Sequence, residues 1–435
     1  PAIEVGGHLT EDTIWSPDNN PYLVTGNIYV DEGVTLTILP GTLIKVLGAS
    51  LNNYYELDLN FWLYGGDSIA KFFWVDGRII AEGTEQDSIV FTRLQDDLDF
   101  CWGTIYITED AELCRFKYCK IEHSCLIGIA LSYITKGLDF YNGKGSVRNC
   151  KFLNCAVSIN SDSYIKELEI INNEFIIDNN VNPFLPVCNY GRNHIMSSRN
   201  NNVDSPDLLI CDNIFEGYGA YYCISIEQLS FVNNTISNCV SSGGIGYFVN
   251  NEFNNCNYAI NGYNGDSLFI KNNRFIGGSR GVDIDYAYVE ITDNYFEECA
   301  LDGPSSPYYT SGKVENNIIN GVNTGIRGRF ETVRNNIIMN SRVGKSVIGS
   351  SDFFQNNIFY GCEHLCSGIS DNSIHENNIY LANDEIFQHT QSVYGNPIFR
   401  NCILDFELPE GCIDGGGNIW VDSLQVQSLF ESIQN

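Results

Sequence analysis

A pair of polar residues followed by one hydrophobic position recurs along most of this chain. The pair is Asn-Asn, or its near-isosteric variant Asp-Asn, and an aliphatic or aromatic residue stands two places after it. The pairs begin at Asn172, Asp212, Asn233, Asn250, Asn272, Asp293, Asn316, Asn335, Asn356 and Asn377. From Asn213 onward the second residue of the pair recurs at steps of about 21, 17, 22, 21, 23, 19, 21 and 21 residues. A period of this kind predicts a solenoid, with one coil for each repeat.

The residue types of the repeat explain how a coil would form. Asn tolerates the left-handed backbone angles of a tight turn better than most other non-Gly residues. In coils stacked about 4.8 Å apart, identical Asn side chains can hydrogen-bond up the stack, while the hydrophobic residue points inward. A second short strand follows in many coils, marked by Gly or Ala before Val or Ile, as at Gly281-Val282 and Gly325-Ile326. We therefore predict an all-β fold, a right-handed parallel β-helix with two or three short strands per coil.

Three regions are expected from this pattern. Residues 1–100 would form an N-terminal cap and the first coils, residues 101–417 the repeats, and residues 418–435 a C-terminal tail or cap with a helix from Ser423 to Ile433. The aromatic-rich stretch from Leu51 to Phe73 is interpreted as a flap over the open end, with an aromatic binding platform as the alternative. The segment from Asn179 to Asp207 is interpreted as a long loop within one coil, or else as a hidden coil. A shorter excursion is expected from Leu301 to Ser311.

Charge narrows the classes of partner. The chain has 24 Lys and Arg residues against 54 Asp and Glu residues, for a formal net charge of −30. Such a surface repels phosphate backbones and anionic membranes, so nucleic acid is not an expected partner. Cationic partners, divalent metals and neutral glycans stay open. The sequence contains no stretch long and apolar enough to cross a membrane.

The 16 cysteines can be placed with the repeat as a ruler. Vertical neighbours on adjacent coils lie within the Cα separation that a disulfide needs. The expected vertical pairs, as disulfides or as stacked thiols, are Cys119 with Cys150, Cys125 with Cys155, and Cys239 with Cys256. Two local pairs could also bridge, Cys362 with Cys366 and Cys402 with Cys412. Disulfides would indicate an oxidising compartment, whereas buried free thiols are the alternative. With 6 His residues and no CxxC spacing, no metal site is predicted from the cysteines.

The chain resembles the pectin-lyase-like superfamily of parallel β-helix proteins. Besides the Asn-Asn coils, the resemblance rests on segments typical of secreted and surface-anchored β-helix proteins: Gly26 to Val30, Gly33 to Thr42, Gly77 to Thr84, Trp102 to Ile105, and Asp405 to Gly416. It covers nearly the whole chain and implies a secreted or cell-surface location. No signal peptide is visible, as expected for a mature secreted protein. The fold hosts lyases, hydrolases and adhesins, so the resemblance leaves the activity open.

One group of outward positions is chemically dense. Asp283 and Asp285 alternate onto one strand face, and Arg327 and Arg329 share that face roughly two coils away. Four tyrosines that could stack on sugar rings lie nearby: Tyr263, Tyr286, Tyr308 and Tyr309. The carboxylates could serve as the acid and base of glycoside hydrolysis. Alternatively they could hold Ca²⁺ beside an Arg, which is what the resemblance to pectate lyases implies. The simplest interpretation is a solvated face with surface ion pairs.

We therefore expect a structural or adhesive protein outside the cell, one that binds a glycan or associates with itself in filaments or sheaths. The alternative is a polysaccharide lyase or glycoside hydrolase that acts on an extracellular glycan. No organic cofactor is expected, and Ca²⁺ is the candidate metal.

Overall fold

The computed structural model confirms a parallel β-helix solenoid. Within the described residues it consists of short strands and one 3-10 turn, η1 (Pro17–Asn19), and contains no α-helix. The described residues are 2–50, 70–97, 100–124, 126–127, 133–134, 136–141, 143–161, 168–176, 195–199, 208–226, 229–243, 246–263, 267–285, 287–299, 302–306, 311–328, 330–346, 353–366, 373–381, 385–387, 396–408 and 410–422.

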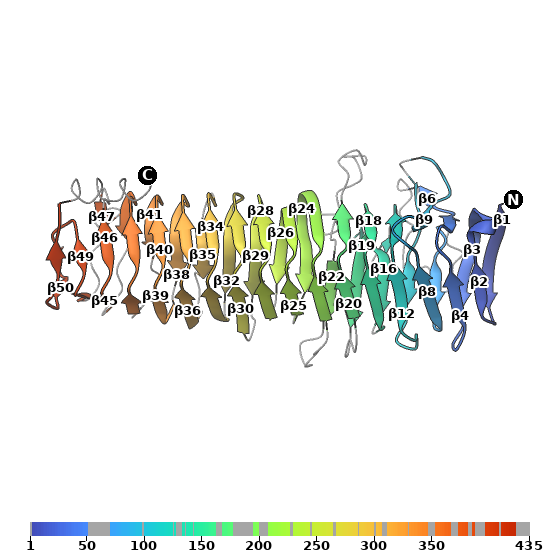
Figure 1. Ribbon diagram of the computed structural model, residues 1–435, viewed down its shortest axis with the longest axis horizontal. Coiled ribbons are helices and arrows are strands. Elements are labelled where there is room, and N and C mark those ends of the chain that lie inside the picture. Colours follow the sequence, from blue (N-terminus) through green and yellow to red (C-terminus); the bar gives the residue numbers. More distant parts are fainter. Residues whose placement is uncertain are drawn as a thin grey trace. The chain divides into compact units, whose positions relative to one another are not determined.

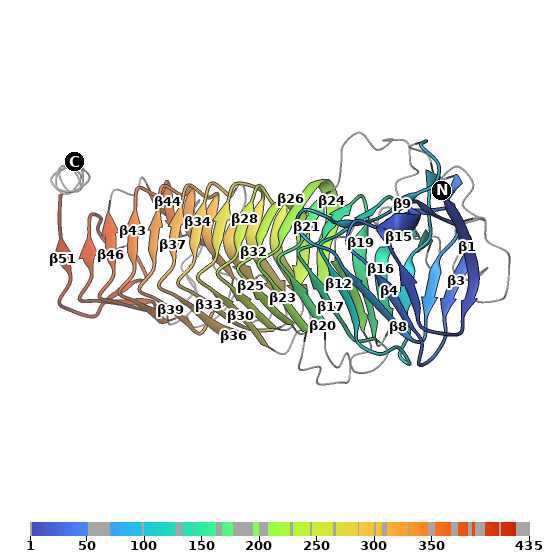
Figure 2. The same ribbon diagram turned by 45° about the vertical axis from the view of Figure 1, so that its right-hand side comes forward.

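Each coil contributes strands to three parallel faces (Figure 1). The first face carries the strand before the Asn pair, the second face the strand after it, and the third face the strand after the next turn. The chain forms two compact units, an N-terminal unit (Pro1–Ser242) and a C-terminal unit (Gly243–Asn435). Within each unit a strand pairs with its counterparts in the neighbouring coils, and Figure 2 shows this succession from a second angle.

In the N-terminal unit, the first face comprises β2 (Thr13–Trp15), β4 (Thr35–Ile38), β8 (Arg78–Glu82), β12 (Cys114–Lys117), β17 (Gly145–Arg148), β20 (Leu168–Ile171), β23 (Leu208–Cys211) and β25 (Leu229–Val232). The second face comprises β5 (Leu43–Val46), β9 (Ile89–Arg93), β13 (Cys119–Glu122), β18 (Lys151–Leu153) and β21 (Glu174–Ile176). The third face comprises β1 (Ile3–Leu9), β7 (Phe73–Val75), β11 (Ile105–Ile107), β16 (Lys136–Tyr141), β19 (Ala156–Ser161) and β22 (Ile195–Arg199). The longer strands are β3 (Tyr22–Val30), β24 (Ile214–Ile226) and β26 (Thr235–Gly243), and the antiparallel pairs are β6 (Ala49–Ser50) with β10 (Phe100–Cys101) and β14 (Leu126–Ile127) with β15 (Tyr133–Ile134).

In the C-terminal unit, the first face comprises β27 (Gly246–Val249), β30 (Ser267–Lys271), β33 (Tyr288–Thr292), β36 (Ser311–Glu315), β39 (Thr332–Arg334), β42 (Phe353–Gln355), β45 (Ile374–Glu376), β48 (Ile398–Arg400) and β50 (Ile413–Asp414). The second face comprises β28 (Glu252–Asn254), β31 (Arg274–Ile276), β34 (Tyr295–Glu297), β37 (Ile318–Asn320), β40 (Ile337–Met339), β43 (Ile358–Tyr360), β46 (Ile379–Leu381), β49 (Ile403–Leu404) and β51 (Ile419–Trp420). The third face comprises β29 (Tyr258–Tyr263), β32 (Arg280–Asp285), β35 (Asp302–Ser306), β38 (Thr324–Gly328), β41 (Val343–Ser346), β44 (His364–Cys366) and β47 (Glu385–Phe387).

The Asn pair performs two tasks in each coil. Its first residue adopts the predicted left-handed backbone, with φ of 56° at Asn172 and 59° at Asn316. Its second residue is buried and forms the predicted ladder, in which the side-chain amide of Asn317 donates to Oδ1 of Asn336 at 3.0 Å. The exposed first residues form an outer ladder, where Nδ2 of Asn335 donates to Oδ1 of Asn316 at 3.1 Å.

The hydrophobic residue after each pair points into the core, as predicted. Phe152, Phe175 and Phe215 form one stack in the N-terminal unit, with successive ring centroids 4.7 and 4.9 Å apart. In the C-terminal unit Phe275 stacks between Phe253 and Phe296 at 5.0 and 4.5 Å. Such ring pairs contribute about 0.5–1.5 kcal/mol each beyond the area they bury.

The pairing also decides between the two interpretations of the segment 179–207. β21 pairs directly with β24, and β20 pairs with β23, so a single coil spans the interval and the hidden-coil alternative is wrong. β22 supplies the third-face strand of that coil. The excursion expected at 301–311 is also wrong in part, because β35 pairs with β32 and β38 as a regular strand. Of the stretch from Leu51 to Phe73 interpreted as a flap, residues 51–69 lie outside the described residues, whereas Phe72 and Phe73 are buried and Phe73 begins β7. The helix expected at 423–433 also lies outside the described residues.

Candidate functional site

The predicted acidic and basic positions fall on the third face of the C-terminal unit. Asp283 on β32 is in register with Ser305 on β35, which is in register with Arg327 on β38. Asp283 and Arg327 are therefore two coils apart, as expected. For Asp285 only the backbone on β32 is described, and Arg329 lies outside the described residues.

The Asp283 carboxylate is engaged within its own strand. Its Oδ2 accepts a hydrogen bond from the Arg280 guanidinium, and these side chains are 14% and 21% exposed. The same guanidinium lies over the ring of Tyr258, 5.4 Å from the ring centroid. Sequence reasoning missed Arg280, which precedes the strand pattern that singled out Asp283. This arrangement fits the interpretation of Asp283 as a member of a surface ion pair.

The four predicted sugar-stacking tyrosines do not define a site. Tyr263 belongs to β29, where only its backbone is described. Tyr286, Tyr308 and Tyr309 lie outside the described residues. A glycan cleft on this face therefore stays a prediction.

Two of the paired cysteines hold ladder positions. Cys119 and Cys150 occupy the buried ladder position in successive coils of the N-terminal unit, and both are free thiols. The backbone N–H of Cys119 donates to Sγ of Cys150 at 3.4 Å, and that of Cys150 donates to Oδ1 of Asn173 at 2.8 Å. The two residues are stacked as the alignment predicted, in the thiol form rather than as a disulfide. Burial, together with the Cys150 thiol, raises the pKa of Cys119 well above its ordinary value.

Cys402 and Cys412, for which a local bridge was possible, are free thiols in the structure. Cys402 also holds a ladder position, and its thiol points at the backbone oxygens of His375 and Arg400, at 3.4 Å each. Cys155 is likewise a free buried thiol, and burial raises its pKa to about 12.

Burial raises the pKa of Cys362 to about 11. Its predicted partner Cys366 has only its backbone described. Cys256 is buried, whereas its predicted partner Cys239 has only its backbone described. Cys125, the predicted partner of Cys155, lies outside the described residues.

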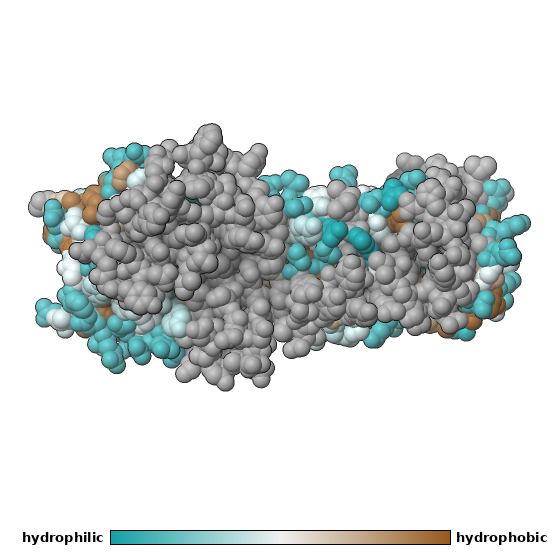
Figure 3. Space-filling model, turned by 180° about the vertical axis from the view of Figure 1, so that it is seen from behind, coloured by the Kyte–Doolittle hydropathy of each residue, from teal (hydrophilic) through white to brown (hydrophobic). Residues whose placement is uncertain are grey.

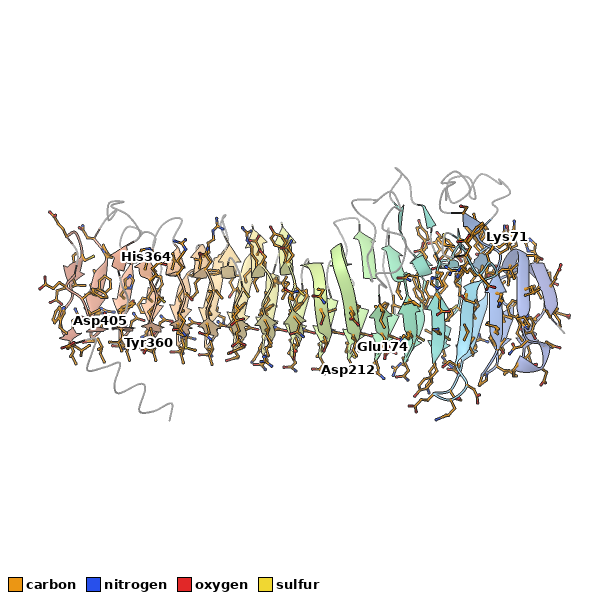
Figure 4. The ribbon with its side chains drawn as sticks, turned by 90° about the horizontal axis from the view of Figure 1, so that it is seen from above. Lys71, Glu174, Asp212, Tyr360, His364 and Asp405 are labelled. Atoms are coloured by element: carbon orange, nitrogen blue, oxygen red, sulfur yellow. The ribbon has the colours of Figure 1, made fainter. Side chains whose placement is uncertain are left out.

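Many of the scarce cations are paired with carboxylates of neighbouring coils. Lys151 lies 2.9 Å from Glu174, whose side chain points outward in Figure 4, and Arg334 lies 2.7 Å from Glu315. Further pairs of this kind are Arg78 with Glu112, Arg148 with Glu169, Lys313 with Glu290, and Arg400 with Glu376. The described surface in Figure 3 is largely hydrophilic. These pairs tie basic side chains of one coil to acidic side chains of the next, in a chain whose acidic residues outnumber its basic ones by 30.

A row of outward aromatic residues on the third face of the N-terminal unit is the feature that sequence reasoning missed. His8, Tyr29, Trp74 and Tyr106 follow one another in register on β1, β3, β7 and β11. We call these four residues the aromatic row. His8 stacks on Tyr29 at 4.6 Å between ring centroids, and Trp74 stacks on Tyr106 at 4.8 Å. No ring contact joins Tyr29 to Trp74 among the described residues, although the two are register partners.

The Trp74 indole is held in place by a carboxylate. Its Nε1 donates to Oδ1 of Asp76 at 2.9 Å, and the hydroxyl of Thr108 donates to the same oxygen at 2.9 Å. Trp74 and Asp76 are both half-buried. The indole thus has one face against Tyr106 and an edge held by Asp76.

Within the described ranges, no group of three or more His, Cys, Asp or Glu residues is arranged to hold a metal ion, so Ca²⁺ binding stays a prediction. None of the helices described has the length and apolarity to span a membrane. No protein-family model and no curated protein sequence matches the chain. The fold is therefore established by the structure, whereas the resemblance to the pectin-lyase-like superfamily rests on the sequence motifs.

Proposed function

We propose that this protein is a structural or adhesive protein of the cell surface or the extracellular space, and that its aromatic row contacts a neutral glycan. The stacked coils serve as the scaffold that holds the row in register. The resemblance of the sequence motifs to those of surface β-helix proteins supports the secreted or surface location.

The geometry of Trp74 carries the glycan part of the proposal. Aromatic side chains with one apolar face and one polar edge suit ligands that combine C–H surfaces with hydroxyl groups. The half-buried indole of Trp74, which stacks on Tyr106, offers the apolar surface, and Asp76 fixes the ring before a ligand arrives. Fixing a side chain in advance reduces the entropy lost on binding. Asp31, which accepts from Nδ1 of His8 at 2.7 Å, adds a second carboxylate beside the row.

The charge of the chain selects among glycans. At a formal net charge of −30 the protein repels polyanionic chains such as polyuronates. Neutral polysaccharides carry no such penalty. The paired state of Asp283 further favours binding over cleavage.

A binding assay with matched variants tests the proposal. The full chain is incubated with insoluble neutral polysaccharides and titrated with their soluble oligosaccharides. We expect Trp74→Ala to weaken binding at least tenfold, about 1.4 kcal/mol, and Trp74→Phe, which keeps a ring but loses the N–H, to weaken it less. Tyr247→Ala is the control, because Tyr247 also stacks outward, on Phe269 at 4.9 Å, but on the first face of the other unit.

Two results would contradict the proposal. One is equal loss of affinity in the Trp74→Ala and Tyr247→Ala proteins, which would mean that the aromatic row has no special role. The other is turnover of a polysaccharide that Asp283→Asn abolishes, which would replace adhesion by the lyase or hydrolase alternative.

A further inference from the structure

The end of the Asn ladder in the C-terminal unit differs from its interior. Inside the ladder, each Asn passes hydrogen bonds to the next coil: the backbone N–H and Nδ2 of Asn357 both donate to Oδ1 of Asn378, at 2.7 and 3.0 Å. Nδ2 of Asn357 also donates to the oxygen of Val333 at 2.8 Å. In the final described coil, the second amide hydrogen has a different kind of acceptor.

Asp414 supplies that acceptor from within the final coil. Asn418 holds the last ladder position, where its Oδ1 accepts from the N–H of Cys402 at 2.8 Å and its Nδ2 donates to Phe399 O at 2.8 Å. The remaining donation of Nδ2 goes to Oδ1 of Asp414 at 2.7 Å, which also accepts from the N–H of Gly416 at 2.8 Å. Asp414 therefore replaces the Oδ1 that a further coil would provide.

Asp414 also occupies a core register. It pairs with Phe399, which is buried and stacks on His375 at 4.3 Å, and His375 stacks on Phe354 at 4.6 Å. The inward column of rings thus ends on a carboxylate that is exposed. Burying this carboxylate beneath another coil would remove a charge from water without a cation to pair it, which is strongly unfavourable.

The rest of the final coil favours association. Ile413, Ile419 and Trp420 are 43%, 58% and 49% exposed, and β50 and β51 each pair with one neighbouring strand in the described part of the chain. Exposed apolar edge strands are templates for strand addition, and an inward-pointing charge is a known protection for such edges.

We propose that Asp414 is a stop residue, which closes the Asn ladder and keeps the apolar edge of β50 and β51 from joining the strand edge of a second copy of this chain. The partner that the charge of Asp414 excludes is a second copy of this chain. The strand edge of such a copy has the same spacing between coils, so it could continue both the strand pairing and the inward stack of rings. This inference does not depend on glycan binding. It implies that any filament of the native protein would form through another surface.

The test compares the mass of the full-length protein and its variants across a range of concentrations by sedimentation velocity. The wild type is expected to stay at the mass of one chain, 48.7 kDa. Asp414→Val, which places an apolar side chain in the core register, is expected at least to double the average mass at high concentration. Asp414→Asn keeps an oxygen acceptor for Asn418 and removes the charge, so it is expected to associate, but more weakly than Asp414→Val.

Two controls make the test specific. Glu410→Val removes an equal charge from an exposed turn position near β50, and this protein should remain a monomer. Adding Ile419→Lys to Asp414→Val should abolish the association, since it charges the exposed edge. The proposal is overturned if Asp414→Val and Asp414→Asn both stay monomeric with unchanged circular dichroism, if Glu410→Val associates equally, or if Ile419→Lys has no effect on the Asp414→Val assembly.

Discussion

Removing one side chain from the inner Asn ladder should destabilise the C-terminal unit far more than removing its exposed neighbour. In the structure, Nδ2 of Asn317 donates to Ile291 O at 2.8 Å, Glu315 O at 3.0 Å and Asn336 Oδ1 at 3.0 Å. Its Oδ1 accepts from N and Nδ2 of Asn294 at 2.9 and 3.0 Å. The side chain is buried, so water cannot replace these bonds.

The magnitude follows from the groups left without a partner. In Asn317→Ala, the backbone N–H of Asn294 and the carbonyl of Ile291 lose this partner in a buried site. Each buried group without a partner costs about 1–3 kcal/mol, so the expected loss is about 2–6 kcal/mol. The control is Asn316→Gly, because Asn316 is exposed, its φ of 59° suits Gly, and its ladder bonds compete with water. The control should lose about 1 kcal/mol or less.

Guanidinium unfolding followed by circular dichroism measures the difference in stability, and amide hydrogen exchange locates it. We expect the Asn294 amide to lose protection in Asn317→Ala and to keep it in Asn316→Gly. If the two variants unfold at the same denaturant concentration and the Asn294 amide stays protected in both, the buried ladder does not stabilise the fold.

Other consequences can be measured in the same way. Cys150→Asn should stabilise the N-terminal unit by about 0.5–1.5 kcal/mol, because a carbonyl oxygen would replace a weak sulfur acceptor for the Cys119 amide; a lower unfolding midpoint would contradict this. Gly278→Ala should cost more than about 2 kcal/mol, since its Cβ would lie 1.9 Å from Cys256 O, whereas Gly33→Ala, with nearly the same φ but nothing within 4 Å, should cost less. Equal midpoints for these two proteins would show that the close approach is unimportant. Burial raises the pKa of Cys114 and Cys155 from 9.0 to about 12, so these thiols contribute stability that is fully present below pH 9 and is lost as the pH rises from 9 towards 12. Titrating the unfolding midpoint against pH in the wild type and in a Cys114→Ala/Cys155→Ala protein tests this, and equal slopes would refute it.

Some features of the site were accessible to sequence reasoning. Tyr29, Trp74 and Tyr106 each stand between two inward hydrophobic residues, as Trp74 does between Phe73 and Val75. This alternation identifies them as outward positions. Their register was not accessible, because Tyr29 and Trp74 lie on paired strands although they are separated in sequence by about two repeat periods.

The candidate Asp283 shows the opposite case. Its outward orientation and its distance from Arg327 in coils were predictable from the repeat alone. Its ion pair with Arg280 was not predictable from the repeat. Arg280 lies three residues earlier, and the path of the backbone between them decides whether the two side chains meet. The same holds for Cys402, whose thiol points at the backbone oxygen of His375 and not at its neighbour in sequence, Cys412.

The sequence by itself determined the solenoid, since a tight turn, an Asn ladder and an inward hydrophobic residue are all local requirements that repeat with every coil. It also determined which positions stack, because the period acts as a ruler wherever it is unbroken. Only the tertiary structure decided which strands become neighbours across irregular segments, as in the aromatic row, and how the ladder ends at Asp414. These features depend on contacts between residues with no fixed spacing, so no periodic pattern could reveal them.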